Sequence, residues 1–530
     1  MRVKMLWSWV CLLLSTLCVT SAFGGKVLVF PLDGSHWVNM KVVIEGLHSR
    51  GHQVDVLRTD DSWYIKEKSS LYTSITLDVE SGFSKDSIIE FVEQLLRIQR
   101  EGNSVWTRLK LEREQTEKAS VMHEKTSKLL MWIFENKTMV ESLRSAKYDL
   151  VLTDPAVPCG VILAHFLKLP LVLNVRWTSH GEGHLAIAPS PLSYVPLTGT
   201  QFSDKMSFFE RVVNNLLFIF AEYQYSKYIQ LHYDGVVQKY LSPDADYRSL
   251  FQAADLWLMR VDFVFEFPRP TMPNVIYMGG FQCKPAKPLP DHLEEFVQSS
   301  GEHGFVIMSL GTLIGELPND LADEIAAAFA KLPQKVIWRY KGAKPSTLGN
   351  NTLLVDWMPQ NDLLGHPKMK LFVAHGGTNG VQEAIYHGVP ILGLPLIFDQ
   401  RDNLLRIVMR KAGKVLDIVT LDHDIFYQGI QEILSDPSYR NNMQRLSRLH
   451  KDQPIPPLDS ALFWIEFVMR HKGAAHLRTE SYQMPWYVYH SVDVLLFLSV
   501  SGAVLALLLM LFIMIKCLCS AICKRKIKRE

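Results

Sequence analysis

The chain has 530 residues, which exceeds what one compact core normally organises and favours two domains with accessory segments. Its 56 basic and 54 acidic residues give a formal net charge of +2, and no dense basic stripe runs through the sequence. Composition and charge therefore argue against a nucleic-acid-binding protein.

The first 23 residues have the layout of a secretory signal peptide. Arg2 and Lys4 precede an apolar stretch, and small residues surround Ala22, where cleavage would occur. An uncleaved N-terminal membrane anchor is the alternative. A cleaved signal predicts that the rest of the chain enters the secretory pathway.

A β-α-β unit is predicted at the start of the mature chain. Residues 26–30 read as a buried strand, residues 38–50 as an amphipathic helix, and residues 54–57 as a second strand. Two more strands are predicted within residues 148–154 and 169–175. The intervening residues 64–138 are more charged and mostly helical in pattern, and we interpret them as an insertion.

Two further features of this half concern possible ligands. His36 follows the first strand in a loop, and Asp154 ends the strand at 148–154, so both are expected at the carboxyl edge of one parallel sheet. Asp149 competes with Asp154 but begins that strand and points to the opposite edge. A histidine oriented by a carboxylate can act as a general base, although a loop histidine is often only structural. The apolar stretch at 208–223 favours a buried amphipathic helix over a helix that touches a membrane.

A linker separates this half from a second one. Residues 283–291, CKPAKPLPD, contain three prolines in a short polar stretch. Beyond them short apolar runs alternate with helix-like segments, which predicts a second parallel sheet buried on both faces. The fold class is therefore α/β, with two Rossmann-like doubly wound domains that face a cleft.

One strand–turn–helix in the second half has the features of an anion site. The strand at 371–374 ends in His375-Gly376-Gly377, and a helix is predicted over 378–387. A helix N-terminus presents free N–H groups and a partial positive charge, and glycines let the backbone approach a ligand. A tight turn without a ligand is equally compatible with these residues alone.

The polar and aromatic residues around this turn suit a nucleotide sugar. A tryptophan face can stack a base, an amide can bond its edge, and carboxylates or amides can bond ribose and sugar hydroxyls. The residues concerned are Trp357, Gln360, Glu383, Asp399 and Gln400.

A second apolar segment lies near the C-terminus. Residues 494–515 carry no charge, and a helix of about 22 residues spans roughly 33 Å, enough to cross a bilayer. Five of the last seven residues are basic, which predicts a cytosolic tail and places the bulk of the chain on the other side. Lys526 and Lys528 fit a dilysine retrieval signal, with a stop-transfer cluster as the alternative.

The remaining cysteine, asparagine and aspartate signals are weaker. Two cysteines, Cys159 and Cys283, lie in the stretch between the signal peptide and the membrane segment, and they permit one disulfide. Asn136 and Asn350 lie in glycosylation sequons, which agrees with a lumenal location. The acidic tripeptides at 244–246 and 422–424 read as surface turns, and no metal site is predicted.

The tract from Trp357 to Gln400 resembles the signature of UDP-glycosyltransferases, and the chain as a whole resembles the animal UDP-glucuronosyltransferases. The resemblance runs from Asp-Gly-Ser-His-Trp at 33–37 to the lysine-rich tail. It implies the GT-B fold, with an acceptor-binding domain at 24–282 and a UDP-sugar-binding domain at 283–450. A helical segment at 451–493, a membrane helix at 494–515 and a cytosolic tail at 516–530 would follow.

The resemblance also implies residue roles. His36 would be the catalytic base and Asp154 its partner, while Trp357 and Gln360 would hold uracil and Glu383 the ribose. The implied contacts to the diphosphate, the sugar or another part of the donor are Ser309, Gly311, Thr312, His375, Gly377, Thr378, Asn379, Gly380, Asp399, Gln400 and Arg260.

The implied reaction is an inverting, metal-independent transfer of glucuronic acid from UDP-glucuronic acid to small lipophilic acceptors, without a further cofactor. Phe398 and Arg401 depart from the usual pattern, so glucose, xylose, galactose or N-acetylglucosamine stay open as donor sugars. Arg401 either helps to bind a carboxylate or is simply solvated. The implied location is the endoplasmic reticulum membrane, with a lumenal catalytic part and oligomers with itself or related enzymes.

Two readings from other classes stay open. One is a non-catalytic lumenal protein that binds a nucleotide sugar or a lipophile, and the other is a cell-surface receptor. The joint presence of residues suited to base catalysis and to donor binding favours the enzyme: His36, Asp154, His375, Asp399 and Gln400.

Overall fold

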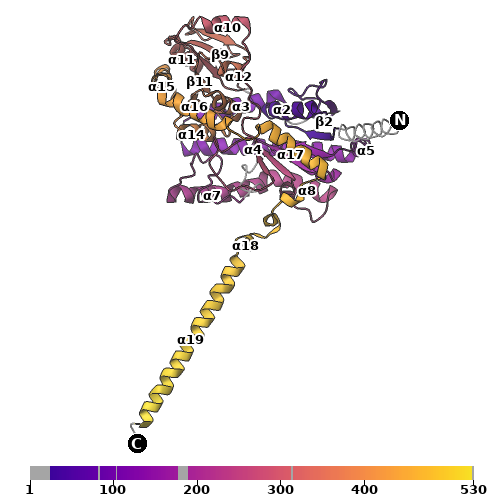
Figure 1. Ribbon diagram of the computed structural model, residues 1–530, viewed down its shortest axis with the longest axis vertical. Coiled ribbons are helices and arrows are strands. Elements are labelled where there is room, and N and C mark those ends of the chain that lie inside the picture. The colour runs from indigo at the N-terminus through magenta and orange to yellow at the C-terminus, as the bar shows by residue number, and fades with distance from the viewer. Residues whose placement is uncertain (1–23, 81–83, 103, 177–188, 312–313, 528–530) are drawn as a thin grey trace, which may run out of the picture. The chain divides into compact units, whose positions relative to one another are not determined.

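The computed structural model describes residues 24–80, 84–102, 104–176, 189–311 and 314–527 (Figure 1). The predicted signal peptide, Thr312 and Lys528 lie outside these residues. The chain divides into two units, residues 1–477 and 478–530.

Seven parallel strands form the first sheet, in the order β3-β2-β1-β4-β5-β6-β7. The order reverses between β1 and β4, which pair in register with Val27 opposite Leu150. Such a switch point opens a crevice at the carboxyl ends of the two strands. The strands are β1 Lys26–Phe30, β2 Gln53–Thr59, β3 Thr73–Leu77, β4 Leu150–Thr153, β5 Leu171–Val175, β6 Leu256–Met259 and β7 Val275–Tyr277.

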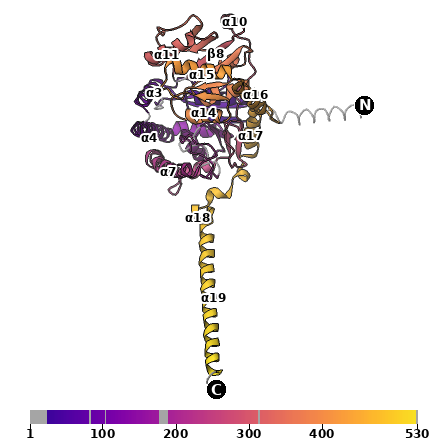
Figure 2. The ribbon, with the colours of Figure 1, turned by 90° about the vertical axis from the view of Figure 1, so that its left-hand side faces the viewer.

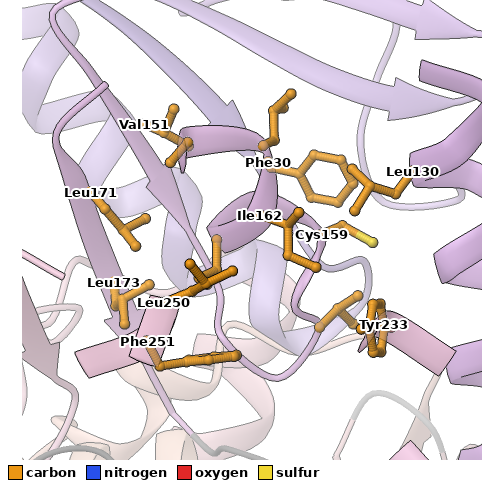
Figure 3. Close-up of a cluster of buried hydrophobic side chains, with 14 of the residues drawn as sticks. Phe30, Leu130, Val151, Cys159, Ile162, Leu171, Leu173, Tyr233, Leu250 and Phe251 are labelled. Atoms are coloured by element: carbon orange, nitrogen blue, oxygen red, sulfur yellow. The ribbon is translucent and has the colours of Figure 1, made fainter. Parts of the chain in front are cut away.

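Helices cover both faces of this sheet, and β4 and β5 are buried along their whole length. Figure 3 shows one of the resulting cores, in which Phe30, Leu130, Val151, Ile162 and Leu250 come from five different elements. The helices are α2 Ser35–Ser49, α3 Lys85–Arg100, α4 Val105–Glu135, α5 Lys137–Ser145, α6 Cys159–Leu167, α7 Phe208–Tyr225, the π-helix η1 Ser226–Gln230, α8 Leu231–Tyr240 and α9 Tyr247–Gln252.

Six parallel strands form the second sheet, in the order β10-β9-β8-β11-β12-β13, and the reversal lies between β8 and β11. The strands are β8 Phe305–Ser309, β9 Lys335–Arg339, β10 Thr352–Val355, β11 Met369–Ala374, β12 Ile391–Gly393 and β13 Gly413–Val415. The helices are α10 Asp291–Gln298, α11 Asn319–Ala330, α12 Gln360–Leu364, α13 Thr378–His387, α14 Gln400–Met409, α15 His423–Ser435, α16 Pro437–Lys451 and α17 Pro457–His471. The chain thus contains two parallel sheets, each with a reversal of strand order, as predicted for two doubly wound domains.

Each half of the chain contributes one helix to the core of the other half. Helix α17 packs against α2, and Figure 1 shows it, drawn in orange, among the indigo and purple elements of the first half. Leu462 of α17 shares a core with Val27 and Trp37. A Cβ at Gly46 of α2 would lie 2.7 Å from Leu462 Cδ1, so any other residue at this position would force the Leu462 side chain to shift.

The reverse contribution comes from α3, which belongs to the predicted insertion. Val92 and Leu95 of α3 are buried in a core that otherwise belongs to the second sheet and its helices. Arg100 at the end of α3 forms an ion pair with Asp320 of α11. The two halves are therefore joined by exchanged helices as well as by the linker.

Three features of the first half were not anticipated from the sequence. The insertion at 64–138 is mostly helical, as expected, but it also contains β3, which pairs with β2 at the edge of the sheet. His36 does not lie in a loop. The left-handed Gly34, with φ 74°, turns the chain so sharply that α2 begins at Ser35, and His36 lies in its first turn.

The third of these features is the apolar stretch at 208–223, for which a buried helix was the favoured expectation. Helix α7 is exposed instead: Phe209 is 76% and Ile219 63% exposed, and α7 lies at the periphery of its unit in Figures 1 and 2. The buried position is the polar Asn214, whose amide bonds to Leu197 N and to two carbonyls of the loop before it. The apolar pattern was correct for a helix, but most of its apolar side chains face outward, and the buried residue within 208–223 is polar.

The second unit holds the predicted membrane segment. It consists of η3 Glu480–Gln483, α18 Trp486–Tyr489 and α19 Val492–Ile527, while η2 Ala475–Leu477 ends the first unit. Residues Val492–Ile522 of α19 are long and apolar enough to span a bilayer, and an 18-residue window within them has a mean hydropathy of 2.7.

Candidate active site

A histidine–aspartate pair lies at the switch point of the first sheet. His36 Nδ1 is 2.7 Å from Asp154 Oδ2. Asp154 follows β4, and its other oxygen accepts a hydrogen bond from Ala156 N at 3.0 Å. With the Nδ1 proton donated to the carboxylate, the Nε2 lone pair of His36 is left to accept a proton.

The competing carboxylate lies elsewhere. Asp149 is at the opposite end of the same strand segment, where it accepts a hydrogen bond from Lys26 N at 2.8 Å and pairs with Lys472. Asp149 and His36 are therefore separated by the length of β4.

The surroundings of the pair set its protonation. Burial lowers the pKa of His36, Asp154 opposes this, and the Arg176 and Arg260 cations lower it further. Burial alone would raise the pKa of Asp154, but His36 and Arg260 outweigh it and hold this pKa below its ordinary value. At neutral pH the pair is thus a neutral imidazole beside a carboxylate, the state that a general base requires.

Arg260 lies behind this pair. Its Nη2 donates to Asp154 Oδ2 at 3.0 Å, and its side chain is only 2% exposed. The resemblance implied a contact to the donor for this arginine. The structure places it against the carboxylate that orients His36, where it fixes the position and charge of Asp154.

The predicted anion site occupies the switch point of the second sheet. Helix α13 spans Thr378–His387, the bounds expected from the sequence, and its first turn follows β11 directly. A Cβ at Gly311 or Gly377 would lie 2.6 or 2.5 Å from His375 Nε2, so both glycines leave room for this imidazole. Burial lowers the pKa of His375 to about 4, which keeps the ring neutral at physiological pH.

Gln360 and Glu383, which were expected on the base and the ribose, lie together. Gln360 Nε2 donates to Glu383 Oε2 at 2.6 Å. Burial raises the pKa of Glu383 to about 7. Trp357 is 66% exposed, and the Arg339 guanidinium lies 5.5 Å from the centre of its ring.

Asp399 and Gln400 differ in what they contact. Asp399 Oδ2 accepts hydrogen bonds from Asn403 Nδ2 at 2.9 Å and from Thr378 Oγ1 at 3.3 Å, which ties it to the start of α13. Gln400 Oε1 accepts from Leu396 N at 2.7 Å and Ile397 N at 3.0 Å. The amide oxygen of Gln400 therefore holds its own loop.

Arg339 is a residue of this site that the sequence analysis missed. It ends β9, is 7% exposed, and donates to the carbonyl of Gly311 in the turn after β8. Ser309 Oγ accepts from Gly311 N at 3.4 Å in the same turn. A charged residue at the carboxyl end of a predicted strand was the signal that could have identified Arg339.

The two halves meet at these edges. Asn39 Nδ2 of α2 donates to Asn379 Oδ1 of α13 at 2.7 Å. A cavity beside this contact is lined from the first half by Arg176 and Met259 and from the second by Thr378 and Asp399. Residues at the carboxyl edges of both sheets thus line one cavity, where doubly wound domains bind their ligands.

Comparison with known proteins shows the family of the chain. The family model described as "UDP-glucoronosyl and UDP-glucosyl transferase" matches residues 25–530. The chain belongs to this family. UDP-glucuronosyltransferase 2B1 of Rattus norvegicus is 42% identical over 479 residues, covering 89% of this chain and 90% of the relative. UDP-glucuronosyltransferase 2B17 of Homo sapiens is 40% identical over 534 residues, covering 99% and 98%.

Solved structures share the fold of this family member at low sequence identity. A variant of Os79 from O. sativa in complex with UDP has a TM-score of 0.57 at 14% identity, covering 84% of this chain and all of that chain. The calicheamicin glycosyltransferase CalG4 has a TM-score of 0.55 at 16% identity, with 84% and 98% covered. These likenesses confirm the two-domain GT-B architecture.

The two residues that depart from the usual pattern both have partners here. Phe398 has a left-handed backbone, with φ 55°, and its ring lies 6.5 Å from that of Phe91 of α3. Arg401 lies 3.8 Å from Asp417, so its charge is turned toward a carboxylate of the protein itself.

The weaker predictions are placed as follows. Cys159 and Cys283 are both free thiols. Asn136 caps α5 through a hydrogen bond from Met139 N, and Asn350 is exposed in a loop. The acidic tripeptides serve as helix caps, with Asp246 before α9 and Asp422 before α15. Within the described ranges, no three His, Cys, Asp or Glu side chains gather as a metal site would require.

Proposed function

We propose that the chain transfers glucuronic acid from UDP-glucuronic acid to a hydroxyl of small lipophilic molecules, with inversion at the anomeric carbon. The observation that carries this proposal is the His36–Asp154 pair, 2.7 Å apart, whose histidine lies on a helix, α2, that also contacts the first turn of α13 through the Asn39–Asn379 hydrogen bond. The curated relatives, named UDP-glucuronosyltransferases, support glucuronic acid as the sugar.

In the proposed reaction His36 Nε2 removes the proton of the acceptor hydroxyl as its oxygen attacks the anomeric carbon. Asp154 keeps the Nδ1 proton in place and stabilises the imidazolium that forms. Arg260 keeps Asp154 ionised and oriented, because its guanidinium donates to the same oxygen that faces His36. Arg260 is thus proposed as a positioning residue.

The leaving diphosphate is proposed to lie at the start of α13. Free backbone N–H groups and the helix dipole at Thr378, Asn379 and Gly380 favour the developing negative charge. The neutral His375 ring, with its pKa lowered to about 4 by burial, donates a hydrogen bond there. Ser309, Gly311 and Thr312 in the turn after β8 and Gly377 before α13 are proposed to shape the same subsite.

The nucleoside is proposed to lie beside Trp357. Uracil would stack on the ring face that Arg339 leaves open, and Gln360 would bond its edge. Glu383 would accept hydrogen bonds from the ribose hydroxyls. Asp399 would bind sugar hydroxyls directly, and Gln400 would do so through its amide nitrogen, because its oxygen is engaged by Leu396 N and Ile397 N.

The membrane location of the enzyme is proposed from the apolar helix α19 and from the basic residues that follow it in the sequence. We propose a single-pass protein of the endoplasmic reticulum membrane, anchored by α19, with residues 24–282 as the acceptor side and 283–450 as the donor side, both lumenal. Lys526 would contribute to a retrieval signal, and Asn136 and Asn350 would carry glycans. Self-association or association with related enzymes is part of the same proposal.

The test is conjugation of 4-methylumbelliferone in membranes from cells that express the full chain, with a panel of UDP-sugars. His36→Ala should abolish turnover with UDP-glucuronic acid. His48→Ala changes the same residue type on the same helix at an exposed position and should leave the rate unchanged. Turnover only with UDP-glucose or another sugar would contradict the proposed donor, and turnover by His36→Ala would contradict the proposed base.

A further inference from the structure

Arg176 is a charged residue in the cavity to which the sequence analysis gave no role. It directly follows β5, so it stands at the same carboxyl edge of the first sheet as His36 and Asp154. It lines the cavity together with Thr378 and Asp399 of the second half. A cation of the acceptor side therefore faces the space proposed for the donor sugar.

The contacts of Arg176 leave its charge available. Its Nη1 donates to Ser35 Oγ at 2.6 Å, which orients the guanidinium from the start of α2. In the part of the chain that the structure describes, no carboxylate forms an ion pair with it, whereas Arg260 pairs with Asp154 and Arg401 with Asp417.

The carboxylates that share this cavity are engaged by other groups. Glu266 pairs with Arg406, and Asp402 accepts backbone hydrogen bonds from Gly199 at 2.6 Å and Gln201 at 3.1 Å. Asp399 accepts hydrogen bonds from the side chains of Asn403 and Thr378. The cavity thus combines occupied acidic groups with a guanidinium that lacks an acidic partner among the described residues.

A UDP-uronic acid has two anionic parts, the diphosphate and the sugar carboxylate. The N-terminus of α13 already provides donors and positive potential for the diphosphate. The carboxylate needs a separate donor that reaches the sugar from outside the diphosphate subsite, and a guanidinium matches a carboxylate with two parallel hydrogen bonds.

We propose that Arg176 binds the carboxylate of the donor's uronic sugar and so selects UDP-glucuronic acid over neutral UDP-hexoses. This inference rests on the proposed function, because it assumes that the sugar occupies the cavity beside Asp399. The assignment differs from the one open at the level of sequence, where Arg401 was the arginine considered for a carboxylate. Arg401 is turned to Asp417 instead.

The electrostatics of the two imidazoles support this location. The charge of Arg176 lowers the pKa of both His36 and His375, which belong to different halves of the molecule. The guanidinium therefore lies close enough to act on both the proposed base and the proposed diphosphate subsite. In the proposed reaction the sugar lies between these two groups.

A second arginine in the cavity supplies a matched control. Arg269 also lines the cavity and also donates to a serine hydroxyl, that of Ser190. Its charge acts on Tyr277 rather than on the two histidines. Arg269→Gln removes the same charge from the same cavity at a position away from the reacting centre.

The experiment is equilibrium binding to the full chain purified in detergent, with UDP-glucuronic acid, UDP-glucose and UDP as separate ligands. Arg176→Gln should weaken UDP-glucuronic acid binding by roughly 10- to 100-fold, the range of a lost hydrogen-bonded charge pair. Binding of UDP and UDP-glucose should change less than about threefold. Arg176→Lys should show an intermediate loss, because it keeps the charge but not the fork.

The outcomes separate this inference from the proposed function. Equal losses of affinity for UDP and UDP-glucuronic acid in Arg176→Gln would assign Arg176 to the diphosphate and overturn the inference. A selective loss of UDP-glucuronic acid affinity in Arg269→Gln but not in Arg176→Gln would also overturn it. Wild-type turnover with UDP-glucuronic acid and unaltered binding by Arg176→Gln would overturn the inference and leave the proposed function. If the wild type bound UDP-glucuronic acid selectively, Arg176→Gln lost that selectivity, and the wild type showed no turnover, the inference would stand and the proposed function would be contradicted.

A folding defect is checked independently. If Arg176→Gln is not recovered folded, Ser35→Ala removes only the hydroxyl that orients the guanidinium at 2.6 Å. It should weaken UDP-glucuronic acid binding several-fold and leave UDP binding unchanged. A Ser35→Ala protein with unaltered selectivity would contradict the inference.

Discussion

Replacement of Asp154 by asparagine tests the active-site geometry most directly, because it changes charge and hydrogen bonding but hardly any volume. The side chain is 1% exposed, and one of its oxygens faces both His36 Nδ1 at 2.7 Å and Arg260 Nη2 at 3.0 Å. In Asp154→Asn the amide oxygen keeps the hydrogen bond from Ala156 N. The amide nitrogen takes the place of Oδ2, where it donates to His36 Nδ1 and leaves Arg260 Nη2 without this acceptor. The imidazole proton then moves to Nε2, which can no longer accept a proton from the acceptor.

The expected loss is large. Inverting the tautomer of an oriented catalytic histidine lowers kcat by roughly 10³- to 10⁴-fold, or about 4–5.5 kcal/mol in activation free energy. Removing the carboxylate also leaves the Arg260 guanidinium buried without its counter-charge, which costs about 3–5 kcal/mol of folding stability. The variant should therefore be measured below the temperature at which it unfolds.

The direction in which the pH profile of kcat/KM shifts distinguishes a lost His36–Asp154 interaction from a purely structural defect. Asp154 raises the pKa of His36 against burial and against Arg176 and Arg260, so its removal lowers this pKa further. Activity requires neutral His36 and is lost as pH falls through its pKa. The acid limb of kcat/KM for 4-methylumbelliferone should thus move to lower pH in Asp154→Asn, while the plateau drops.

Asp149→Asn is the matched control, with the same change at the other end of β4. The amide oxygen can still accept from Lys26 N, but the ion pair with Lys472 is lost, so stability should fall while kcat stays within about threefold of the wild type. A loss below tenfold in Asp154→Asn, or an acid limb that moves to higher pH, would refute the base assignment.

Two further predictions concern nucleotide binding and the exchanged helix. Glu383 has its pKa raised to about 7 by burial, and its carboxylate accepts hydrogen bonds from the ribose hydroxyls more strongly than the protonated acid does, so UDP affinity should fall as pH decreases through about 7. Inhibition by UDP measured across this range should lose its pH dependence in Glu383→Gln; a wild-type affinity that rises toward acid would contradict the contact. Leu462→Ala in α17, at a side chain 2% exposed, should lower the free energy of unfolding by about 2–5 kcal/mol. Its neighbour Phe463 is 49% exposed, and Phe463→Ala should change the unfolding midpoint far less; equal effects would argue against the packing of α17.

The sequence predicted the local architecture well because local physics determines it. Buried parallel strands are short apolar runs, and α13 starts where a strand ends in two glycines, so its bounds were predicted correctly. The proximity of His36 and Asp154 followed from one rule, that carboxyl ends of parallel strands share an edge.

The sequence did not predict against which part of the molecule α3 and α17 pack. The apolar face of α3 shows that Val92 and Leu95 must be buried, but not that the second sheet buries them. Helix α17 was expected to lead toward the membrane, and its packing on α2 depends on long-range shape, including the missing Cβ of Gly46. Hydrophobic periodicity carries no information about such choices.

Individual side-chain roles were limited in the same way. The rule that singled out His36 and Asp154 applies equally to Arg176 and Arg339, which also end or follow strands, yet isolated arginines are too common at the surface to be selected by type. Gln400 illustrates the converse, because its amide oxygen is engaged by the backbone of its own loop. Only the three-dimensional contacts distinguish an available polar group from an engaged one.

The exchange of α3 and α17 between the two halves has a consequence for biosynthesis. A nascent chain leaves the ribosome with its N-terminus first, and N-terminal domains commonly fold before the later ones are synthesised. Here the strand that begins with Lys26 shares its core with α17, the last helix before the membrane-anchoring unit. The first half therefore cannot complete its core until the second has been synthesised, and meanwhile α3 presents its apolar face without the second sheet. The two halves must mature as one product, and a chain truncated before Pro457 would leave an uncovered apolar surface on β1, β4 and α2 for the cell's quality control to detect.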